Sequence, residues 1–441
     1  MRSFNSDVFK SRRDEFFNKM DDGVAVLIGS KLTYRNEDVA YPFRQNSDFY
    51  FLTGFEEPES YAFFIKSGED QKFVLVVPER DETAEVWTGF RAGITDAIET
   101  YKADEAFEID NPNVFKEKLR EYASDKPRIY FPLGFDEKED KVFIELKKMM
   151  YWKGKKGNTF PPIILCPRKL IHEIRMIKSS NDIKILEHAA DITKRGFVKA
   201  MKESRPGMFE YQVQAMLDYE YRRLGSARDG YEHIVAAGEN ACVLHYVANK
   251  KKIEENELIL IDSGAECQYF SADVTRTFPA GTKFTEAQKE IYNLVLKSQE
   301  EAIKMSKPGE NLEDIHTKVC EIIREGLKEL GFFKFSSDAE IEKEKMERRY
   351  FMHGTSHWLG MDVHDVGMYK IDGTPIPLAP GMVFTIEPGL YFDPRDKRVP
   401  EQYRGIGIRI EDDILITEGG NRNLTYMIPK TVEEIESLLN E

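Results

Sequence analysis

Acidic residues interrupt the most strand-like segments in the C-terminal half of the chain. Residues 260–278 read LIDSGAECQYFSADVTRTF, which has the pattern of two strands joined by a turn and carries Asp262 and Asp273 in its two arms. The segments MVFTIEPGLYF and GIGIRIEDDILIT likewise carry Glu387 and Glu411. A carboxylate inside an apolar strand is costly unless it is paired or coordinated. The four acids therefore need partners that the strands themselves do not supply.

The register of the predicted hairpin decides how close its two aspartates lie. If the strands pair around Cys267 and Gln268, Asp262 and Asp273 face each other, and directly opposed residues have Cβ atoms about 4.5–5.5 Å apart. Two carboxylates this close repel unless a proton or a cation lies between them. The alternative is that one aspartate caps a turn and that the register differs. The hairpin alone leaves both interpretations open.

The histidines add a nitrogen ligand to the acidic set. Three of the eight fall within FMHGTSHWLGMDVHDVG, namely His353, His357 and His364, and a fourth, His245, lies in NACVLHY. A lone histidine is more often a core residue than a ligand, but three within a dozen residues and beside glycines favour a site. Four carboxylates and an imidazole suit hard or borderline divalent ions such as Mn²⁺. Five such side chains suit two ions about 3.5–4 Å apart that share carboxylates.

The chain divides into two parts of α/β (α+β) type. In the first, GVAVLIG, DFYFLTG, SYAFFIK and KFVLVVP are expected as strands and DEKEDKVFIELKKMMYW as a helix. A Lys/Gly/Pro-rich connector at residues 153–167 is the expected border. The second part opens with the helical pattern NDIKILEHAADITKRGFVKAMKES. We expect domains at residues 1–172 and 173–441.

Charge and composition exclude several classes of partner. The net charge of −15 would repel phosphate backbones and anionic lipid, so we expect no nucleic-acid and no membrane partner. No apolar run approaches the roughly 20 residues that span a bilayer, and the N-terminal residues lack an apolar signal core. The four cysteines form no CxxC pair, so we expect reduced thiols and a cytoplasmic protein.

These residues resemble the dinuclear site of the pita-bread metallopeptidases, the methionine aminopeptidase–creatinase–prolidase superfamily. Within it the chain is similar to the Xaa-Pro aminopeptidase (aminopeptidase P) family, in the stretches LHYVAN, LIDSGAECQYFSADVTRTFPA, YFMHGTSHWLGMDVHDVG, GMVFTIEPGLYF and VPEQYRGIGIRIEDDILIT. YPFRQNSDFYFLTGFEEPES and AEVWTGFRAG resemble that family's non-catalytic N-terminal domain. The resemblance implies a C-terminal pita-bread catalytic domain behind a smaller α/β domain. It also implies metal-dependent release of the N-terminal residue from peptides with proline at the second position.

The resemblance also implies a role for each acidic residue. Two divalent ions, expected to be Mn²⁺, would be held by Asp262, Asp273, His357, Glu387 and Glu411. Asp262 would bind one ion, Asp273 and Glu411 would bridge both, and His357 and Glu387 would complete the other shell. A water between the ions would become a metal-bridging hydroxide nucleophile. Glu387 would take its proton and pass it to the leaving proline nitrogen.

Five further residues are assigned to the substrate by the same resemblance. His364 and His245 would donate hydrogen bonds to the carbonyl oxygen, and His353 would hold the proline side. Arg409 would orient a carboxylate or the substrate backbone, or would be a buried counter-ion to the four acids. Trp87 resembles a tryptophan that, in related enzymes, reaches into a neighbouring subunit's site, which implies a homo-oligomer, a dimer or a tetramer.

Other functions remain open to different degrees. A prolidase cuts only Xaa-Pro dipeptides with the same ligands and is the nearest alternative. Methionine aminopeptidases usually lack a long N-terminal domain of this kind, and creatinase works without the metal ligands. Inactive pita-bread binding modules lose ligands and often gain charged tails, whereas this chain keeps all five ligands. A nucleophilic hydrolase is disfavoured because the chain has no GxSxG and no cysteine beside a histidine in sequence.

Overall fold

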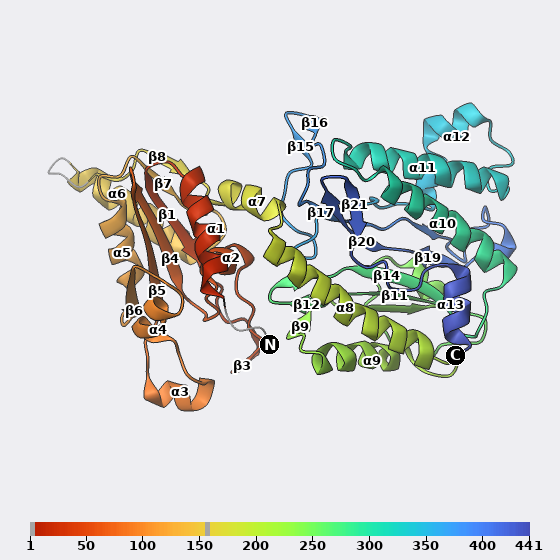
Figure 1. Cartoon of the computed structure of the whole chain (residues 1–441), viewed down its shortest axis with the longest axis horizontal. Coiled ribbons are helices and arrows are strands. Elements are labelled where there is room, and N and C mark those ends of the chain that lie inside the picture. Colours follow the sequence, from red (N-terminus) through yellow and green to blue (C-terminus); the bar gives the residue numbers. More distant parts are fainter. Residues whose placement is uncertain (1–4, 155–158) are drawn as a thin grey trace. The chain divides into compact units, whose positions relative to one another are not determined.

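The computed structural model describes residues 5–154 and 159–441. The chain divides into two compact units, Met1–Ile174 and Arg175–Glu441 (Figure 1). The border expected between residues 172 and 173 falls inside helix α7 (Arg168–Met176), and the functional division there remains a proposal. The connector expected at 153–167 is partly structured, because Ile163–Leu165 forms strand β8 of the first unit. Residues 155–158 of that connector lie outside the described residues.

The first unit is built on a six-stranded sheet with the strand order β6-β5-β4-β1-β7-β8. Neighbours β5, β4 and β1 are antiparallel, whereas β6 runs parallel to β5, and β7 and β8 run parallel to β1. The segments GVAVLIG, SYAFFIK and KFVLVVP form strands, as predicted. The strands are β1 (Gly23–Ile28), β4 (Tyr61–Ser67), β5 (Asp70–Pro78), β6 (Glu105–Ile109), β7 (Arg128–Tyr130) and β8, with a separate hairpin of β2 (Tyr34–Asn36) and β3 (Val39–Ala40).

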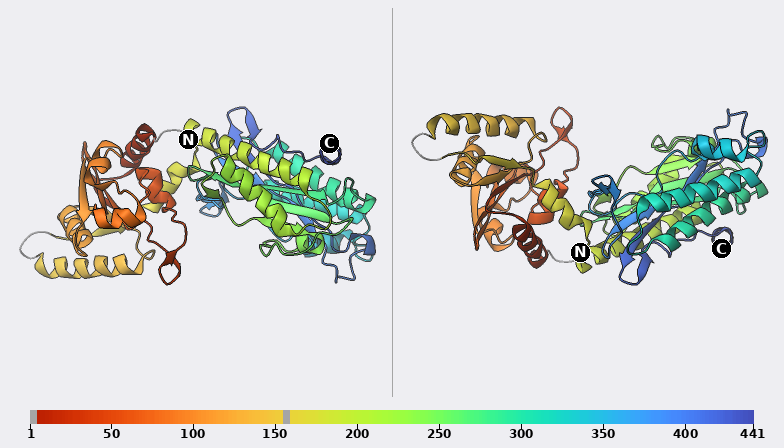
Figure 2. Two further views of the ribbon diagram at one scale, coloured as in Figure 1. Left: turned by 90° about the horizontal axis from the view of Figure 1, so that it is seen from below. Right: turned by 90° about the horizontal axis from the view of Figure 1, so that it is seen from above.

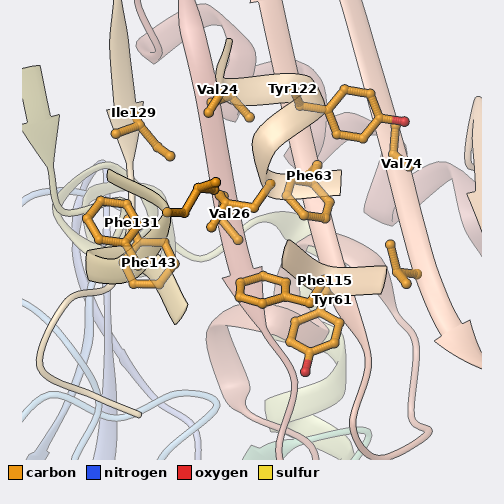
Figure 3. Packing of buried hydrophobic residues seen from close by; sticks show 14 of the residues in the cluster. Val24, Val26, Tyr61, Phe63, Val74, Phe115, Tyr122, Ile129, Phe131 and Phe143 are labelled. Carbon is orange, nitrogen blue, oxygen red and sulfur yellow. The ribbon is translucent and has the colours of Figure 1, made fainter. Parts of the chain in front are cut away.

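Aromatic side chains from two helices pack against this sheet (Figure 3). The ring of Tyr61 stacks on Phe115 of α5, and that of Phe131 on Phe143 of α6, with centroids 4.3 and 4.2 Å apart. Each fully buried side chain of this size contributes roughly 1.5–3 kcal/mol, so the unit has a core of its own. Its helices are α1 (Ser6–Lys19), α2 (Ser47–Thr53), α3 (Glu82–Thr88), α4 (Gly93–Glu99), α5 (Val114–Ala123), α6 (Glu137–Lys153) and α7.

The segment DFYFLTG, expected as a strand, forms helix α2, so that prediction was wrong. Asn46 caps the helix by accepting a hydrogen bond from the N–H of Phe49 at 3.0 Å, and Gly54 ends it with a left-handed φ of 69°. All residues of α2 are buried. A helix that is apolar on every side shows the same continuous apolar run as a buried strand. The flanking Asn and Gly are the signals that distinguish the two.

The second unit places short strands between pairs of long helices. Figures 1 and 2 show α8 and α9 on one side of the strands and α10 and α11 on the other. The predicted helix NDIKILEHAADITKRGFVKAMKES is α8, which begins with a capping box between Ser179 and Asp182. In the part of the chain that the structure describes, no helix is long and apolar enough to cross a bilayer. The helices are α8 (Ser180–Glu203), α9 (Glu210–Arg223), α10 (Glu286–Met305), α11 (Leu312–Glu329), α12 (Asp338–Glu344) and α13 (Val432–Leu439).

The middle of this unit contains antiparallel sheets in the orders β10-β11-β14, β17-β20-β21 and β13-β12-β9, and the pair β18–β19. Every residue of β11 and β14 is buried, so a charged side chain there needs partners inside the protein. The strands are β9 (Arg228–Asp229), β10 (Ile234–Ala237), β11 (Leu258–Ser263), β12 (Ala265–Cys267), β13 (Phe270–Ser271), β14 (Val274–Pro279), β17 (Val383–Ile386), β18 (Gly389–Tyr391), β19 (Gly407–Arg409), β20 (Asp412–Thr417) and β21 (Gly420–Asn423).

The hairpin that carries the two aspartates turns one residue later than expected. Cys267 pairs with Phe270, so Gln268 and Tyr269 form the turn, with left-handed φ values of 47° and 71°. A two-residue type I′ turn requires positive φ at both central positions. Asp262 therefore pairs with Thr275, and Asp273 is its diagonal rather than its direct neighbour. An offset of two residues keeps both aspartates on the same side of the hairpin.

Candidate metal centre

Nine of the ten predicted site residues line one cavity of about 420 Å³ in the second unit. They are Asp262, Asp273, His357, Glu387, Glu411, His245, His353, His364 and Arg409. The tenth, Trp87, lies on α3 of the first unit, where it is 85% exposed. The structure thus brings together residues more than 160 positions apart in sequence. Their individual roles remain proposals.

Backbone pairing places His357 and Glu387 next to each other. The N–H of Thr385 donates to the carbonyl of His357 at 2.9 Å, and the N–H of Glu387 donates to that of Thr355 at 2.8 Å. The residues after Thr355 therefore run beside β17. His357 Nε2 and Glu387 Oε1 lie 3.9 Å apart as a result. Glu411, just beyond β19, is fixed in the same way, because its N–H donates to the carbonyl of Thr275 at 3.1 Å.

Asp273 lies at the centre of the acidic cluster. One ligand atom each from Asp273, His357 and Glu411 lie within 4.8 Å of one another. His357 Nε2 is 3.2 Å from Asp273 Oδ2. The hydroxyl of Tyr231 is 2.6 Å from Asp262 Oδ1 and also forms a hydrogen bond with Asp273. The two aspartates of the hairpin therefore share a site although they do not pair directly.

Buried negative charge outweighs positive charge in this cluster. Burial, followed by repulsion from Asp273, raises the pKa of Glu411 well above its usual range. Burial raises the pKa of Glu387 to about 7, although His357 and Arg409 oppose the change. The pKa of Asp262 is raised as well, chiefly by burial. A cation among these oxygens would favour their charged forms and remove the conflict.

The imidazole of His357 is oriented for coordination. Its Nδ1 lies 3.0 Å from the carbonyl oxygen of Trp358, which fixes the Nδ1–H tautomer and turns Nε2 toward Asp273. Burial lowers its pKa, but the hydrogen bond to Asp273 and the negative charges of Asp273 and Glu387 together outweigh burial and raise the pKa to about 9. Metal-binding histidines commonly donate the second ring N–H to a carbonyl in this way. Carboxylate oxygens, one imidazole and an excess of negative charge together fit divalent cations.

Arg409 is bound within the acidic cluster. Its guanidinium donates to Asp262, to the hydroxyl of Tyr391 at 3.0 Å and to Thr275 Oγ1 at 3.1 Å. Thr275 in turn donates to Glu411 Oε2 at 2.7 Å. These contacts support the interpretation of Arg409 as a buried counter-ion to the acids. The side chain of Arg409 is 4% exposed, so little of it is left for a substrate.

Sequence reasoning missed four polar residues that contact the cluster: Tyr231, Thr275, Tyr391 and Asp413. Asp413 accepts a hydrogen bond from the N–H of Asp273 at 3.2 Å, and burial raises its pKa well above the usual range. Thr275 had a detectable signal, because it lies two residues from Asp273 and thus on the same strand face. The two tyrosines, Tyr231 and Tyr391, belong to no motif, and a single hydroxyl gives no periodic signal.

The loop that carries His364 is fixed by two buried cations. Arg175 donates to Asp365 at 2.6 Å and to Asp362 at 2.7 Å, and Lys178 donates to Asp365 at 3.0 Å. The side chains of Arg175, Lys178 and Asp365 are each at most 2% exposed. The ring of His364 lies 4.4 Å from that of His357, between centroids. Buried ion pairs thus hold this loop next to the acidic cluster.

We expect Arg175→Met to lower the free energy of unfolding by roughly 3 kcal/mol, because it leaves Asp365 buried with only one cation. Thermal unfolding monitored by calorimetry measures the change. Lys10→Met is the matched control, since it breaks an exposed pair with Asp14 on α1 that contributes little. Equal effects of the two substitutions would contradict a role for burial at Arg175.

Family models match most of the chain. The model described as metallopeptidase family M24 matches residues 184–418, and that described as aminopeptidase P, N-terminal domain, matches residues 9–130. The Xaa-Pro aminopeptidase of Escherichia coli is 42% identical over 442 residues, covering 100% of this chain and 99% of that protein. Xaa-Pro aminopeptidase 3 of Homo sapiens is 32% identical over 424 residues, covering 95% and 81%.

Solved structures show the same architecture. The structure of Pseudomonas aeruginosa aminopeptidase PepP matches with a TM-score of 0.96 and 38% identity, covering 100% of this chain and 99% of that one. Zn-substituted E. coli aminopeptidase P in complex with product matches with a TM-score of 0.95 and 39% identity, covering 99% and 98%. The expected architecture, a smaller α/β domain followed in sequence by a pita-bread domain, is confirmed.

Proposed function

The chain belongs to metallopeptidase family M24, and from this we propose that it is an Xaa-Pro aminopeptidase, which releases the N-terminal residue from peptides with proline at position two. The observation that carries the proposal is the gathering of Asp262, Asp273, His357, Glu387 and Glu411 in one buried cavity. The similarity to Xaa-Pro aminopeptidases over both units supports the substrate class.

Divalent metal ions belong to this site, since the family is one of metallopeptidases and the donor set fits them. We extend this to two Mn²⁺ ions. Asp262 would contact one ion, His357 and Glu387 the other, and Asp273 and Glu411 both. When bound, the ions would supply a water of lowered pKa as the nucleophile.

Glu387 is the proton carrier in this proposal. Its carboxylate accepts the proton of the attacking water and delivers it to the nitrogen that leaves. That nitrogen belongs to proline, so the scissile bond is a tertiary amide without an N–H. The departing amine must therefore gain a proton, and a carboxylate held beside the reacting atoms can supply it. General acid–base catalysis of this kind contributes about 10²–10⁴-fold.

Three histidines contact the substrate in this proposal. His364 and His245 donate hydrogen bonds to the scissile carbonyl oxygen as charge develops there. Burial and the neighbouring His357 lower the pKa of His364, so it acts as a neutral donor. His353 has both nitrogens engaged, with the carbonyl of Gly354 at 2.7 Å and the hydroxyl of Tyr391 at 2.8 Å. Its ring is therefore the surface that it offers to the proline.

The direct test compares an Xaa-Pro dipeptide with an Xaa-Pro-Yaa tripeptide, each with added Mn²⁺ and with a chelator. The proposal requires cleavage of the tripeptide between its first residue and proline, lost on chelation. Cleavage confined to the dipeptide would make the protein a prolidase with the same site. Cleavage of neither substrate by metal-loaded protein would favour an inactive binding module.

We expect His364→Ala to lower kcat about a hundredfold, the loss typical of one oxyanion donor. Metal content should stay at the wild-type value, because His364 is not among the proposed ligands. Turnover of a tripeptide and elemental analysis of the same sample measure both quantities. Parallel losses of activity and metal would assign His364 a structural role instead.

A homo-oligomer is part of the proposal through Trp87. Val86, Trp87 and Phe90 are 82%, 85% and 92% exposed in a single chain. Exposed apolar groups of this size commonly mark an interaction surface. Sedimentation of the wild-type protein beside Trp87→Ser would test whether the protein forms an oligomer through this surface. A monomeric wild type would contradict the proposed homo-oligomer.

A further inference from the structure

A second cavity, of about 830 Å³, adjoins the one that holds the acidic cluster. The two are lined by consecutive residues of the same segments: Val243 and Met352 line the second cavity, whereas Leu244 and His353 line the first. Tyr391 also lines the second cavity, and its hydroxyl is 2.8 Å from His353 Nε2. Met352 and Tyr391 of the second cavity are therefore immediate neighbours of His353, which the proposed function places on the proline side.

Basic side chains are concentrated in this second cavity, which we call the basic cavity. Two of its arginines are already paired: Arg395 forms two hydrogen bonds with Asp393, and Arg398 forms two with Asp396. These pairs contribute little net charge. The cations of the lining are Arg349, Arg395, Lys397 and Arg398.

The other two cations have no carboxylate of their own. Among the described residues, neither Arg349 nor Lys397 forms an ion pair, and both are exposed. The remaining acid of the lining is Glu239, so the basic cavity is net positive in a chain of net charge −15. The basic cavity therefore carries positive charge, whereas the neighbouring cavity with the acidic cluster carries negative charge. An acidic ligand is therefore attracted to the basic cavity and repelled by the bare acidic cluster.

Two apolar side chains of the basic cavity stand next to the first cavity in the chain. Val243 and Met352 are 54% and 51% exposed, and each is followed by a residue that lines the first cavity, Leu244 and His353 respectively. A peptide that follows proline runs extended, at about 3.1–3.4 Å per residue. The third and fourth residues of a substrate would then lie roughly 3–7 Å beyond the proline, within reach of the side chains next to His353 in the chain.

We propose that the basic cavity binds a carboxylate from the part of the substrate that follows the proline. The carboxylate is either an acidic side chain at the third or later position or the C-terminus of a short peptide. Arg349 and Lys397 supply the positive charge, and Val243 and Met352 support the backbone. This inference rests on the proposed function, because it takes His353 to lie on the proline side of the bond that is cut.

The test uses metal-loaded full-length enzyme and peptides Ala-Pro-Ala-Xaa-Ala with an amidated C-terminus, where Xaa is Asp, Ala or Lys. We expect kcat/KM for the Asp peptide to be about threefold or more above that for the Lys peptide. The difference should come from a lower KM. In high salt the ratio of the two kcat/KM values should approach one. Moving the Asp to the third or fifth position locates the contact. A free C-terminus on Ala-Pro-Ala should lower KM relative to its amide if the peptide terminus is also bound.

Charge reversal identifies the residues. Lys397→Glu and Arg349→Glu should each invert the preference, so that the Lys peptide becomes the better substrate. Lys307→Glu is the control, because it changes the net charge equally at an exposed position outside both cavities. An unchanged Asp-to-Lys ratio in the two cavity variants, or the same change in the control, would overturn the inference. Failure to cleave even the Ala peptide would instead refute the proposed function.

Discussion

Asp273→Ala and Glu411→Ala are each expected to abolish peptide hydrolysis, with kcat/KM falling by more than about 10³-fold. One oxygen of each carboxylate lies within 4.8 Å of a ring nitrogen of His357, at the point where the proposed ions would share ligands. Removing either one deprives two ions of a common ligand rather than one ion of a single contact. The expected loss therefore includes metal as well as activity.

Elemental analysis beside kcat/KM for an Xaa-Pro-Yaa tripeptide measures both losses. Glu232→Ala is the matched control, because Glu232 lines the same cavity but is exposed and outside the cluster. The control should keep the metal content of the wild type. Near-normal turnover of Asp273→Ala or Glu411→Ala with both metals bound would show that the two-metal assignment is wrong.

The acidic residues could be found from sequence because each one violates a local rule. Asp262 and Glu411 stand in segments that otherwise have the composition of buried strands, and such a conflict marks a functional site. His353, His357 and His364 were identified for a different reason, because three of the eight histidines fall within a dozen residues. What these patterns do not contain is the geometry between segments, which depends on long-range pairing such as that of Thr385 with His357.

The errors in the sequence interpretation have equally specific causes. Helix α2 looked like a strand because a fully buried helix and a buried strand are both continuously apolar. The hairpin register was displaced because Gln268 and Tyr269 take the left-handed conformation without the Asn-Gly signal that usually marks such a turn. Neither error changed the predicted face of Asp273, because the displaced register kept the period of two.

The residues that support the site could not be predicted from the sequence for a different reason. Arg175 and Lys178 precede Asp365 by more than 180 positions, and nothing in a local window indicates that they meet. Tyr231 likewise contacts Asp262 and Asp273 only through the folding of β10 against β11. Single residues that complete a site without forming a motif require the fold to be known.

Metal-free protein should become less stable as the pH rises from 5 to 8, and metal should remove most of that loss. Burial raises the pKa of Glu387 from 4.5 to about 7. A carboxyl group whose pKa is raised by folding stabilises the protein fully below its unfolded pKa, and the contribution is lost as the pH rises through the folded value. A rise of this size corresponds to roughly 3 kcal/mol, and Glu411 adds to it in the same direction.

Three histidines oppose this sign, because burial lowers the pKa values of His316, His353 and His364, and their contributions to stability grow as the pH rises toward 6.5. The raised pKa values of Glu387, Glu411 and Asp413 act over a wider part of the window and in the other direction. The pKa of His357 is raised to about 9, so its contribution is also lost as the pH rises. The pKa of Asp365 is lowered, because Lys178 and Arg175 outweigh burial. A lowered carboxyl pKa gives stability that is already complete by pH 5, so Asp365 contributes no slope in this window. The pKa of His233 is also raised to about 9, so its contribution is lost in the same direction as that of His357.

The difference between metal-loaded and chelated protein reports on the groups that the metal contacts. Calorimetry at pH 5 and pH 8 should show a larger increase in Tm on Mn²⁺ addition at pH 8, because the cation replaces protons that the cluster holds at pH 5. Glu387→Gln should reduce the pH dependence of the chelated protein, since the amide does not titrate. If the chelated wild type were more stable at pH 8 than at pH 5, the conflict among these carboxylates would not exist, and the strongest structural reason for placing cations between them would be lost.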